Sequence, residues 1–191
     1  MKKILILLLK LIGALFIVGA IGVFAIIIKY RLELPNLQSM VEDYKPQMAT
    51  IIYDKNNNVV DTLSVEAREV VKLEDVSPYV KDAFLAIEDK QFYSHHGLNF
   101  KGIAREVITT FLKGRATQGG SSITQQLAKN AFLTPEKTFS RKVKEAILTY
   151  QIERTYTKDE ILERYLNEIY YGSGSYGIKN AAEQYFKKDV K

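Results

Sequence analysis

The sequence predicts a mainly α-helical domain with a small β-hairpin region, preceded by one N-terminal transmembrane helix. Three observations lead to this prediction. An uncharged run of 18 residues, 11–28, lies near the N-terminus. Two short β-prone runs follow it, on either side of a turn sequence. From residue 77 onward, apolar residues recur at helical spacing, and capping sequences separate the helices.

The uncharged run has about the minimum length for a helix that crosses a bilayer. Lys10 interrupts the apolar stretch before it, but a lysine near the end of a span can place its ammonium group at the interface. A cleaved signal peptide is the alternative, and it would need a small-x-small cleavage site, which residues 25–36 lack. We therefore favour an uncleaved anchor. Three lysines precede the centre of the span and only Lys29 and Arg31 follow it, which favours a cytoplasmic N-terminus and an external domain.

The net charge of +5 belongs to the anchor region. Residues 1–31 hold five of the 27 basic residues and no acidic residue, so the remainder has 22 basic and 22 acidic residues. Within this neutral remainder, residues 101–144 carry nine basic residues against two acidic ones. Such a confined positive region suits a small polyanionic group better than a long duplex, so we expect no nucleic acid. The chain has no cysteine, which neither supports nor excludes an exported domain.

The region between anchor and helices has weak local signals. Residues 32–48 contain two prolines and no sustained period, so we expect a connector there. The runs 50–53 and 59–63 enclose the turn sequence DKNNN and predict a hairpin, with 70–73 as a candidate third strand. The predicted division is therefore a cytoplasmic tip and transmembrane anchor over 1–31, a connector and small β region over 32–76, and a helical domain over 77–191.

Helix starts are clearly marked in the helical domain. Ser77 and Pro78 form a cap with proline at the first helical position, and the helix they start runs toward Glu88. The other predicted helices cover 100–112, the residues from Ser122, 139–155, the residues from Thr157, and 178–186, with a turn at 172–177. Those from Ser122 and Thr157 begin with capping boxes. The chain stops directly after a helix, so we expect a fragment whose helical domain is truncated at its C-terminal end.

The stretch 118–145 combines features of an anion site. The glycine pair at 119 and 120 allows unusual backbone geometry, and the helix start that follows exposes N–H donors. Five cations surround this start: Lys129, Lys137, Arg141, Lys142 and Lys144. Donors, helix dipole and ammonium groups together suit a phosphate or pyrophosphate. The spacing is not that of a nucleotide P-loop, so an ordinary NTPase is excluded.

Two carboxylates are candidates for proton transfer. On a helix, Glu88 would lie one turn from both Phe84 and Phe92, and loss of water between aromatic rings would suit it to proton transfer near neutral pH. A solvated carboxylate at the rim of an amphipathic helix is the alternative. Glu145 follows Arg141 by four residues, a spacing that also fits an ordinary surface salt bridge. With the anion site and the anchor, these carboxylates suit sugar transfer from a lipid-linked pyrophosphate.

No residue pattern requires a metal. His95 and His96 are adjacent, lack ligand spacing and have no cysteine beside them, so a helix end with one histidine capping carbonyls is favoured over a metal site. We predict no certain cofactor. A divalent cation such as Mg²⁺ or Mn²⁺ could assist by neutralising a pyrophosphate, although no set of residues demands one.

Five sequence blocks, in order, carry a resemblance to a known family. They are EDKQFYSHHG at 88–97, GGSSITQQ at 119–126, RKVKE at 141–145, KDEILERYLNEIYYG at 158–172 and GIKNAAEQYFKK at 177–188. Their order and spacing resemble glycosyltransferase family 51. This is the peptidoglycan glycosyltransferase domain of class A penicillin-binding proteins and of monofunctional glycosyltransferases.

The resemblance implies a lysozyme-like glycosyltransferase domain that polymerises lipid II into glycan strands outside the membrane, by inverting transfer with release of undecaprenyl pyrophosphate. The implied partners are lipid II, the growing glycan strand and membrane lipid, with cell-wall synthesis or division proteins as further candidates. It implies Glu88 as the general base that activates the acceptor 4-hydroxyl, and Glu145 as a second essential carboxylate that orients the substrate or assists the leaving group. The implied substrate-binding and pyrophosphate-binding residues are Ser121, Ser122, Gln125, Gln126, Lys129, Lys137, Arg141, Lys142 and Lys144.

Some positions depart from the family pattern. Ser122 stands where threonine is usual, Lys187 where glycine is usual, and Lys137 where arginine is frequent, which keeps the charge but loses bidentate geometry. The family continues with another helical segment, and class A members add a transpeptidase domain, so the activity of this chain alone stays open. Two alternatives remain. One is a glycan-cleaving lysozyme-like hydrolase, which also uses two carboxylates but needs no cation cluster. The other is a non-catalytic membrane scaffold.

Overall fold

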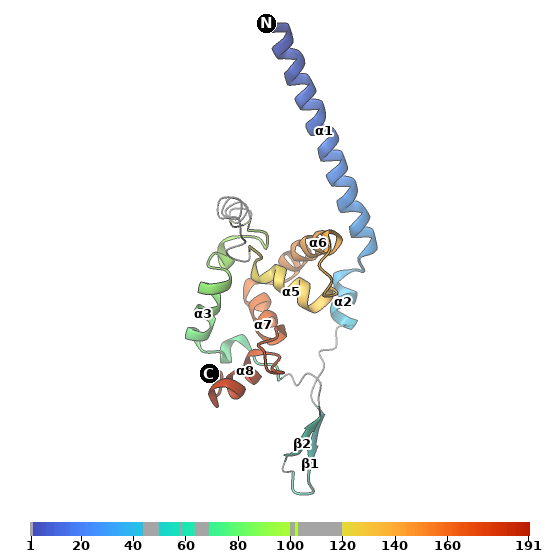
Figure 1. Ribbon diagram of the computed structural model, residues 1–191. Coiled ribbons are helices and arrows are strands. Elements are labelled where there is room, and N and C mark those ends of the chain that lie inside the picture. The colour runs from blue at the N-terminus through green and yellow to red at the C-terminus, as the bar shows by residue number, and fades with distance from the viewer. Residues whose placement is uncertain (1, 44–49, 58, 64–68, 100–101, 103–119) are drawn as a thin grey trace.

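The computed structural model describes the chain except for residues 1, 44–49, 58, 64–68, 100–101 and 103–119. A long helix, α1 (Lys2–Glu33), leaves a cluster of shorter helices, and a hairpin projects from the far end of that cluster (Figure 1). This confirms the prediction of a mainly α fold with a small β-hairpin. The helix predicted over 100–112, apart from Gly102, and the residues Gln118 and Gly119 lie outside the described residues.

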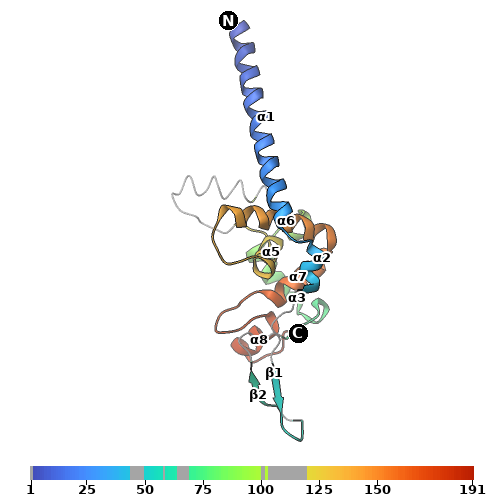
Figure 2. The same cartoon turned by 90° about the vertical axis from the view of Figure 1, so that its right-hand side faces the viewer.

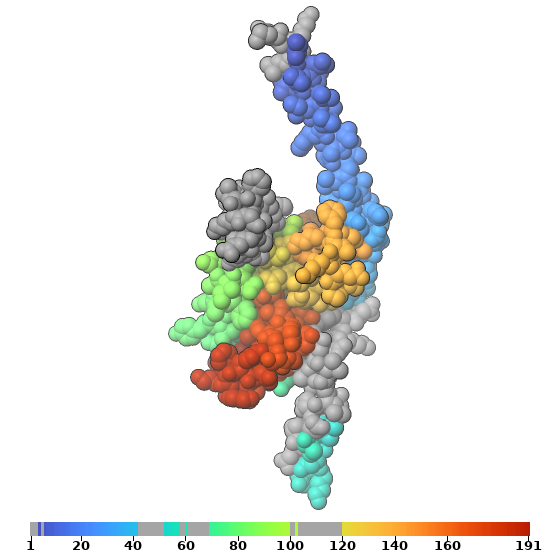
Figure 3. Space-filling view, viewed as in Figure 1, coloured from blue at the N-terminus to red at the C-terminus, as the bar shows by residue number. Residues whose placement is uncertain are grey.

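Helix α1 has the length and composition to cross a membrane. Its apolar part, Ile6–Glu33, is 28 residues long, with a mean hydropathy of 2.9 in its most apolar window. None of that window is buried inside the protein. The space-filling view shows α1 standing clear of the helical cluster over most of its length (Figure 3). Its C-terminal end packs against α6 (Phe139–Thr155).

The expected connector contains a short helix, α2 (Leu37–Asp43), which the sequence analysis did not predict. Asn36 begins it, because its side chain accepts a hydrogen bond from the backbone N–H of Gln38 at 3.1 Å. Leu37 is buried in the main core, and α2 packs against α6. A helix this short is stabilised by such tertiary packing rather than by its own period, which explains why no periodic signal marked it.

The hairpin forms where it was predicted. Strands β1 (Thr50–Tyr53) and β2 (Val59–Leu63) pair antiparallel, with a register irregularity between Ile52 and Tyr53. In the turn, the Asp54 side chain accepts from the Asn56 backbone at 2.7 Å. Asn57 adopts a φ of +64°, a left-handed conformation that asparagine tolerates well.

Residues 70–73 do not form the candidate third strand. The side-chain amide of Asn167 in α7 (Lys158–Glu168) pairs with the backbone of Val71 instead. It accepts from the Val71 N–H and donates to the Val71 carbonyl, both at 2.9 Å. A side-chain amide thus replaces a neighbouring strand, and the chain then enters the 3₁₀ turn η1 (Leu73–Asp75).

The helices of the main domain largely match their predicted bounds. Helix α3 (Pro78–Glu88) starts at the predicted proline, and the 3₁₀ turn η2 (Phe92–Ser94) follows it. Helices α5 (Ile123–Phe132) and α7 both begin with complete capping boxes, and α8 (Ile178–Phe186) follows a turn that includes three glycines with positive φ. Helix α5 packs against both α6 and α7, and both views place it near the middle of the cluster (Figures 1 and 2). The buried core therefore surrounds α5.

Candidate active site

Two adjacent glutamines of α5 connect the two predicted carboxylates. Gln126 Nε2 donates to Glu88 Oε2 at 2.8 Å, and Gln125 Nε2 donates to Glu145 Oε1 at 3.3 Å. Successive residues of a helix point about 100° apart, so one helix can hold side chains from α3 on one side and from α6 on the other. The start of α5 thus fixes the relative placement of Glu88 and Glu145.

The capping box of α5 orients the first of these amides. The Ser122 N–H donates to Gln125 Oε1 at 3.0 Å, so the amide nitrogen of Gln125 is left to face Glu145. The Ser122 hydroxyl accepts from the Gln125 N–H at 3.2 Å and donates to the carbonyl of Gly97. Ser122 is buried and its hydrogen bonds stabilise the fold, and its implied role in substrate or pyrophosphate binding stays a prediction.

A buried Asp89–His95 pair ties the Glu88 region to the start of α5. Asp89 accepts from His95 Nε2 at 2.9 Å and from the Ile123 N–H at 3.3 Å. The Gly97 N–H donates to His95 Nδ1 at 3.1 Å, so the ring proton lies on Nε2. The expectation that a histidine caps backbone carbonyls is therefore wrong. Across the described residues, no group of three or more histidine, aspartate or glutamate side chains could hold a metal ion.

Glu88 is solvent-exposed and does not lie between two aromatic rings. Helix α3 ends at Glu88, so Phe92 belongs to η2 and is buried in the core rather than one turn further along the helix. Phe84 contacts the rings of Tyr165 and Tyr171 edge-on, with centroids 6.5 and 5.7 Å away. The alternative of a carboxylate at the helix rim describes this geometry better. Glu88 also lines one edge of an apolar cavity of about 570 Å³ between α3 and α8.

Glu145 has the opposite environment. Its side chain is 2% exposed and pairs with Arg141 Nη1 at 3.0 Å and with the Lys142 ammonium, whose side chains are 17% and 49% exposed. Lys142 also donates to the Ser121 hydroxyl at 3.0 Å. A carboxylate buried among donors needs such partners to offset its desolvation. Two cations and one carboxylate leave one positive charge, which faces outward through Lys142.

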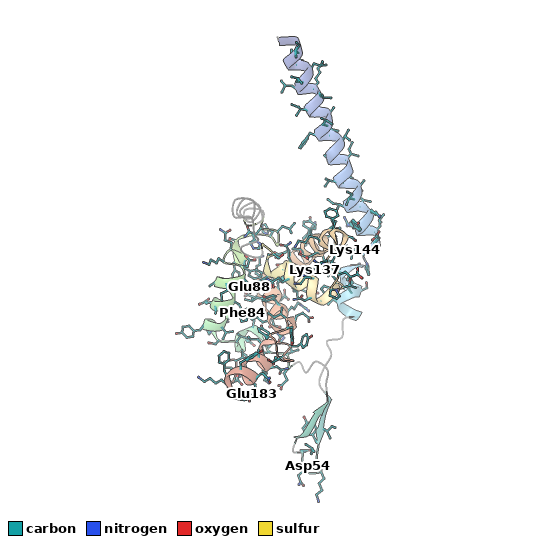
Figure 4. All side chains as sticks on the ribbon, viewed as in Figure 1. Asp54, Phe84, Glu88, Lys137, Lys144 and Glu183 are labelled. Atoms are coloured by element: carbon teal, nitrogen blue, oxygen red, sulfur yellow. The ribbon has the colours of Figure 1, made fainter. Side chains whose placement is uncertain are left out.

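The remaining predicted cations are placed differently from one another. Lys129 lies in the last turn of α5 and is partly buried, Lys137 is exposed just before α6, and neither forms an ion pair with the described residues. Lys144 does not join the Glu145 cluster. It pairs with Glu33 at the end of α1 at 2.9 Å, with its ammonium 5.6 Å from the Tyr30 ring centre. In Figure 4, Glu88 lies on the α3 side, and Lys137 and Lys144 lie toward α6.

A second buried ion pair was missed by the sequence analysis. Glu153 of α6 is 6% exposed and accepts from Lys158 at 2.8 Å and from the Thr124 hydroxyl. Lys158 also lies over the Phe92 ring, 4.4 Å from its centre. Its position at the first residue of α7 is typical of a solvated lysine, and no local pattern shows that three segments meet there. This pair joins α5, α6 and α7 beneath the candidate site.

The structure defines a mainly helical domain attached to a helix that is long and apolar enough to cross a membrane. Residues 56–191 match the family described as transglycosylase, and the chain belongs to this family. This confirms the resemblance and the fold class found from the five sequence blocks. The boundaries 1–31, 32–76 and 77–191 stay a prediction.

Several curated proteins are similar to this chain. Penicillin-binding protein 1F of Bacillus subtilis (strain 168) is 50% identical over 140 residues, covering 73% of this chain and 20% of its own length. Penicillin-binding protein 1A of Aquifex aeolicus (strain VF5) is 42% identical over 190 residues, covering 100% of this chain and 26% of its own length. Penicillin-binding protein 1A of Neisseria flavescens is 44% identical over 177 residues, covering 93% and 22%. The chain therefore spans between a fifth and about a quarter of the length of these relatives.

Proposed function

We propose that this domain is a peptidoglycan glycosyltransferase that polymerises lipid II into glycan strands by inverting transfer, with release of undecaprenyl pyrophosphate. The observation that supports it best is the contrast between its carboxylates. Glu88 is exposed and carries a single amide donor among the described residues, whereas Glu145 is buried with two cations. One carboxylate is thus available to a substrate proton, and the other holds the cations that an anionic leaving group requires.

In the proposed reaction, Glu88 takes the proton of the acceptor 4-hydroxyl. The acceptor oxygen attacks the anomeric carbon of the lipid-linked sugar as the bond from that carbon to the pyrophosphate oxygen breaks. The electron pair leaves with the pyrophosphate, and the configuration at the anomeric carbon inverts. A positioned general base contributes about 10²- to 10⁴-fold to such a step.

The pyrophosphate would lie against Arg141 and Lys142, with Lys129 and Lys137 as further cations. Glu145 then acts on the substrate indirectly, because its contacts fix the positions of Arg141 and Lys142. Preorganised cations stabilise a developing negative charge without having to reorganise during the reaction. A divalent cation such as Mg²⁺ would neutralise further pyrophosphate charge, and its requirement is tested by assaying polymerisation after EDTA treatment, with and without added Mg²⁺.

The cation cluster favours this function over a glycan-cleaving hydrolase, because hydrolysis expels a sugar rather than a pyrophosphate. The long apolar helix fits a lipid-linked substrate. We also propose that the N-terminus is cytoplasmic and the helical domain external, from the excess of lysines before the span. The exposed Asn56 is replaced by cysteine, and intact cells are treated with a thiol reagent that does not cross the membrane. Labelling in intact cells is expected, and labelling only in lysed cells would contradict this orientation.

Polymerisation of labelled lipid II by the chain in detergent tests the proposed function. We expect Glu88→Gln to lower the rate by about 10²-fold or more while its circular dichroism spectrum stays unchanged. Glu183→Gln, on an exposed part of α8, is the matched control and should keep the unaltered rate. Full polymerisation by Glu88→Gln, or shortening of preformed glycan without polymerisation, would contradict the proposal.

A further inference from the structure

Glu88 is held by an amide whose own orientation depends on a second residue. Gln126 Nε2 lies 2.8 Å from Glu88 Oε2, and the Tyr165 hydroxyl lies 3.4 Å from Gln126 Oε1. An ionised carboxylate only accepts hydrogen bonds, so the nitrogen of the Gln126 amide must face Glu88. The amide oxygen then faces Tyr165, and the phenol must be the donor.

Tyr165 is suited to serve as a fixed donor. It is fully buried in α7, and its ring contacts Phe84 of α3 edge-on, which restricts rotation of the phenol. Burial raises the pKa of Tyr165 well above its usual value, and the charge of Glu88 raises it further. The hydroxyl therefore keeps its proton at any pH where the enzyme works.

We propose that Tyr165 is a positioning residue for Glu88, which fixes the Gln126 amide so that its nitrogen holds one carboxylate oxygen. The other oxygen, Oε1, makes no hydrogen bond to the described residues, and it is the one left to take the acceptor proton. Gln126 thereby gains a role beside the substrate contact that the resemblance implied. This inference rests on the proposed function, in which Glu88 is the base.

The neighbouring Gln125 is oriented in the same way, by a donor that binds its amide oxygen. There, a backbone N–H at the helix start occupies the amide oxygen and directs the nitrogen to Glu145. The Ser122 N–H is used by Gln125, so the donor to the amide oxygen of Gln126 is the Tyr165 hydroxyl instead. Each carboxylate thus receives a directed amide, and each amide has a separate donor that prevents it from flipping.

Other titratable groups lie near Glu88 and must be considered in any test. The cavity beside it is also lined by Tyr79, Tyr171, Tyr185, Lys188, Asp189 and Lys191. Asp89, next in sequence, is paired with His95. Tyr171 is the matched control for Tyr165, because it is a largely buried tyrosine that touches the same Phe84 ring, but its hydroxyl donates to the Leu166 carbonyl at 3.2 Å.

The experiment follows the Glu88 carboxyl directly. The whole chain, labelled with ¹³C-glutamate in detergent micelles, is titrated by NMR, and the Glu88 resonance is assigned by its loss in Glu88→Gln. A hydrogen bond to the ionised form favours that form, so Tyr165→Phe should raise the midpoint of the titration by about 0.5 to 1 pH unit. Gln126→Ala should raise it at least as much, the double variant no further, and Tyr171→Phe should leave it unchanged.

An unchanged midpoint in Gln126→Ala would overturn the proposal, and so would an equal rise in Tyr171→Phe or additive effects in the double variant. If Tyr165→Phe does not fold, Gln126→Ala still decides whether the amide acts on Glu88. The titration requires no catalysis, so its failure leaves the proposed function standing. Conversely, full polymerisation by Glu88→Gln would contradict the proposed function and leave the hydrogen-bond result intact.

Discussion

Replacing Gly97 by alanine should loosen the contact between the Glu88 region and helix α6. Gly97 has a φ of +79°, a conformation that costs an L-residue about 1 kcal/mol. An added Cβ would also lie 2.6 Å from Thr149 Cγ2 and 2.7 Å from Glu153 Cγ. Both distances are too short for carbon atoms, so both neighbours, or residue 97 itself, must move.

Neither neighbour can move at low cost. The Thr149 hydroxyl donates to the Glu145 carbonyl at 2.7 Å, and the Glu153 carboxylate is held by Lys158 at 2.8 Å. Overpacking at a well-packed site costs about 1 to 3 kcal/mol, so the total loss of unfolding free energy should be about 2 to 4 kcal/mol. Because Thr149 is bonded to the backbone of Glu145, we also expect slower lipid II polymerisation.

Gly174→Ala separates the two contributions. Gly174 has a φ of +77°, almost the same as Gly97, but an added Cβ would meet nothing within 4 Å. It should therefore lose only the conformational cost of about 1 kcal/mol. Denaturant unfolding in detergent, followed by circular dichroism, gives both values. Equal losses in the two variants would refute the steric argument.

Two further predictions concern charged and ionisable groups. Lys158→Met leaves Glu153 buried without its cation and should lower the unfolding free energy by about 3 kcal/mol. Lys179→Met removes an exposed pair with Glu69 and should change the unfolding free energy by no more than about 0.5 kcal/mol in the same denaturation assay. Similar losses in the two variants would contradict the difference expected between a buried and an exposed ion pair. Burial, with the bond to Asp159, raises the pKa of Tyr93 to about 12 from an ordinary 10.0. The folded state thus keeps this proton longer than the unfolded state, so the stabilisation is complete below pH 10 and declines as the pH rises toward 12. The free energy of unfolding, measured between pH 10 and pH 12, should decline less steeply with pH in Tyr93→Phe than in the unaltered chain. An unchanged slope would contradict the role given to the Tyr93 proton.

Helix starts could be predicted because the signals that mark them are local. Ser122 and Thr157 cap helices through residues three positions away, and the structure shows both capping boxes complete. The hairpin could be predicted for the same reason, since its turn residues form hydrogen bonds with one another, as between Asn56 and Asp54. Short-range chemistry of this kind is fully present in the sequence.

Contacts between distant residues could not be predicted in the same way. Asn167 pairs with Val71 across 96 positions, and only the folded chain shows that a side chain there replaces a strand. Tyr165 is buried in its helix, and the helical period of the apolar residues does not show where its hydroxyl points. The spacing of Lys144 next to Glu145 suggested a shared site, and helix geometry instead turns Lys144 toward α1, because adjacent residues diverge by about 100°.

The ion pair between Lys144 and Glu33 has a consequence for where the domain can act. Helix α1 continues unbroken from its apolar part to Glu33, and Lys144 immediately precedes Glu145 in the chain. Among the described residues, the membrane-length helix therefore contacts the segment that carries the cation cluster directly, without a flexible linker between them. This contact would fix the distance of the cluster from the membrane surface. Each residue added to α1 between Ile28 and Tyr30 would lift the cluster by about 1.5 Å and turn it by about 100°. Such a rigid attachment matches the proposed substrate, whose pyrophosphate stays at the membrane surface.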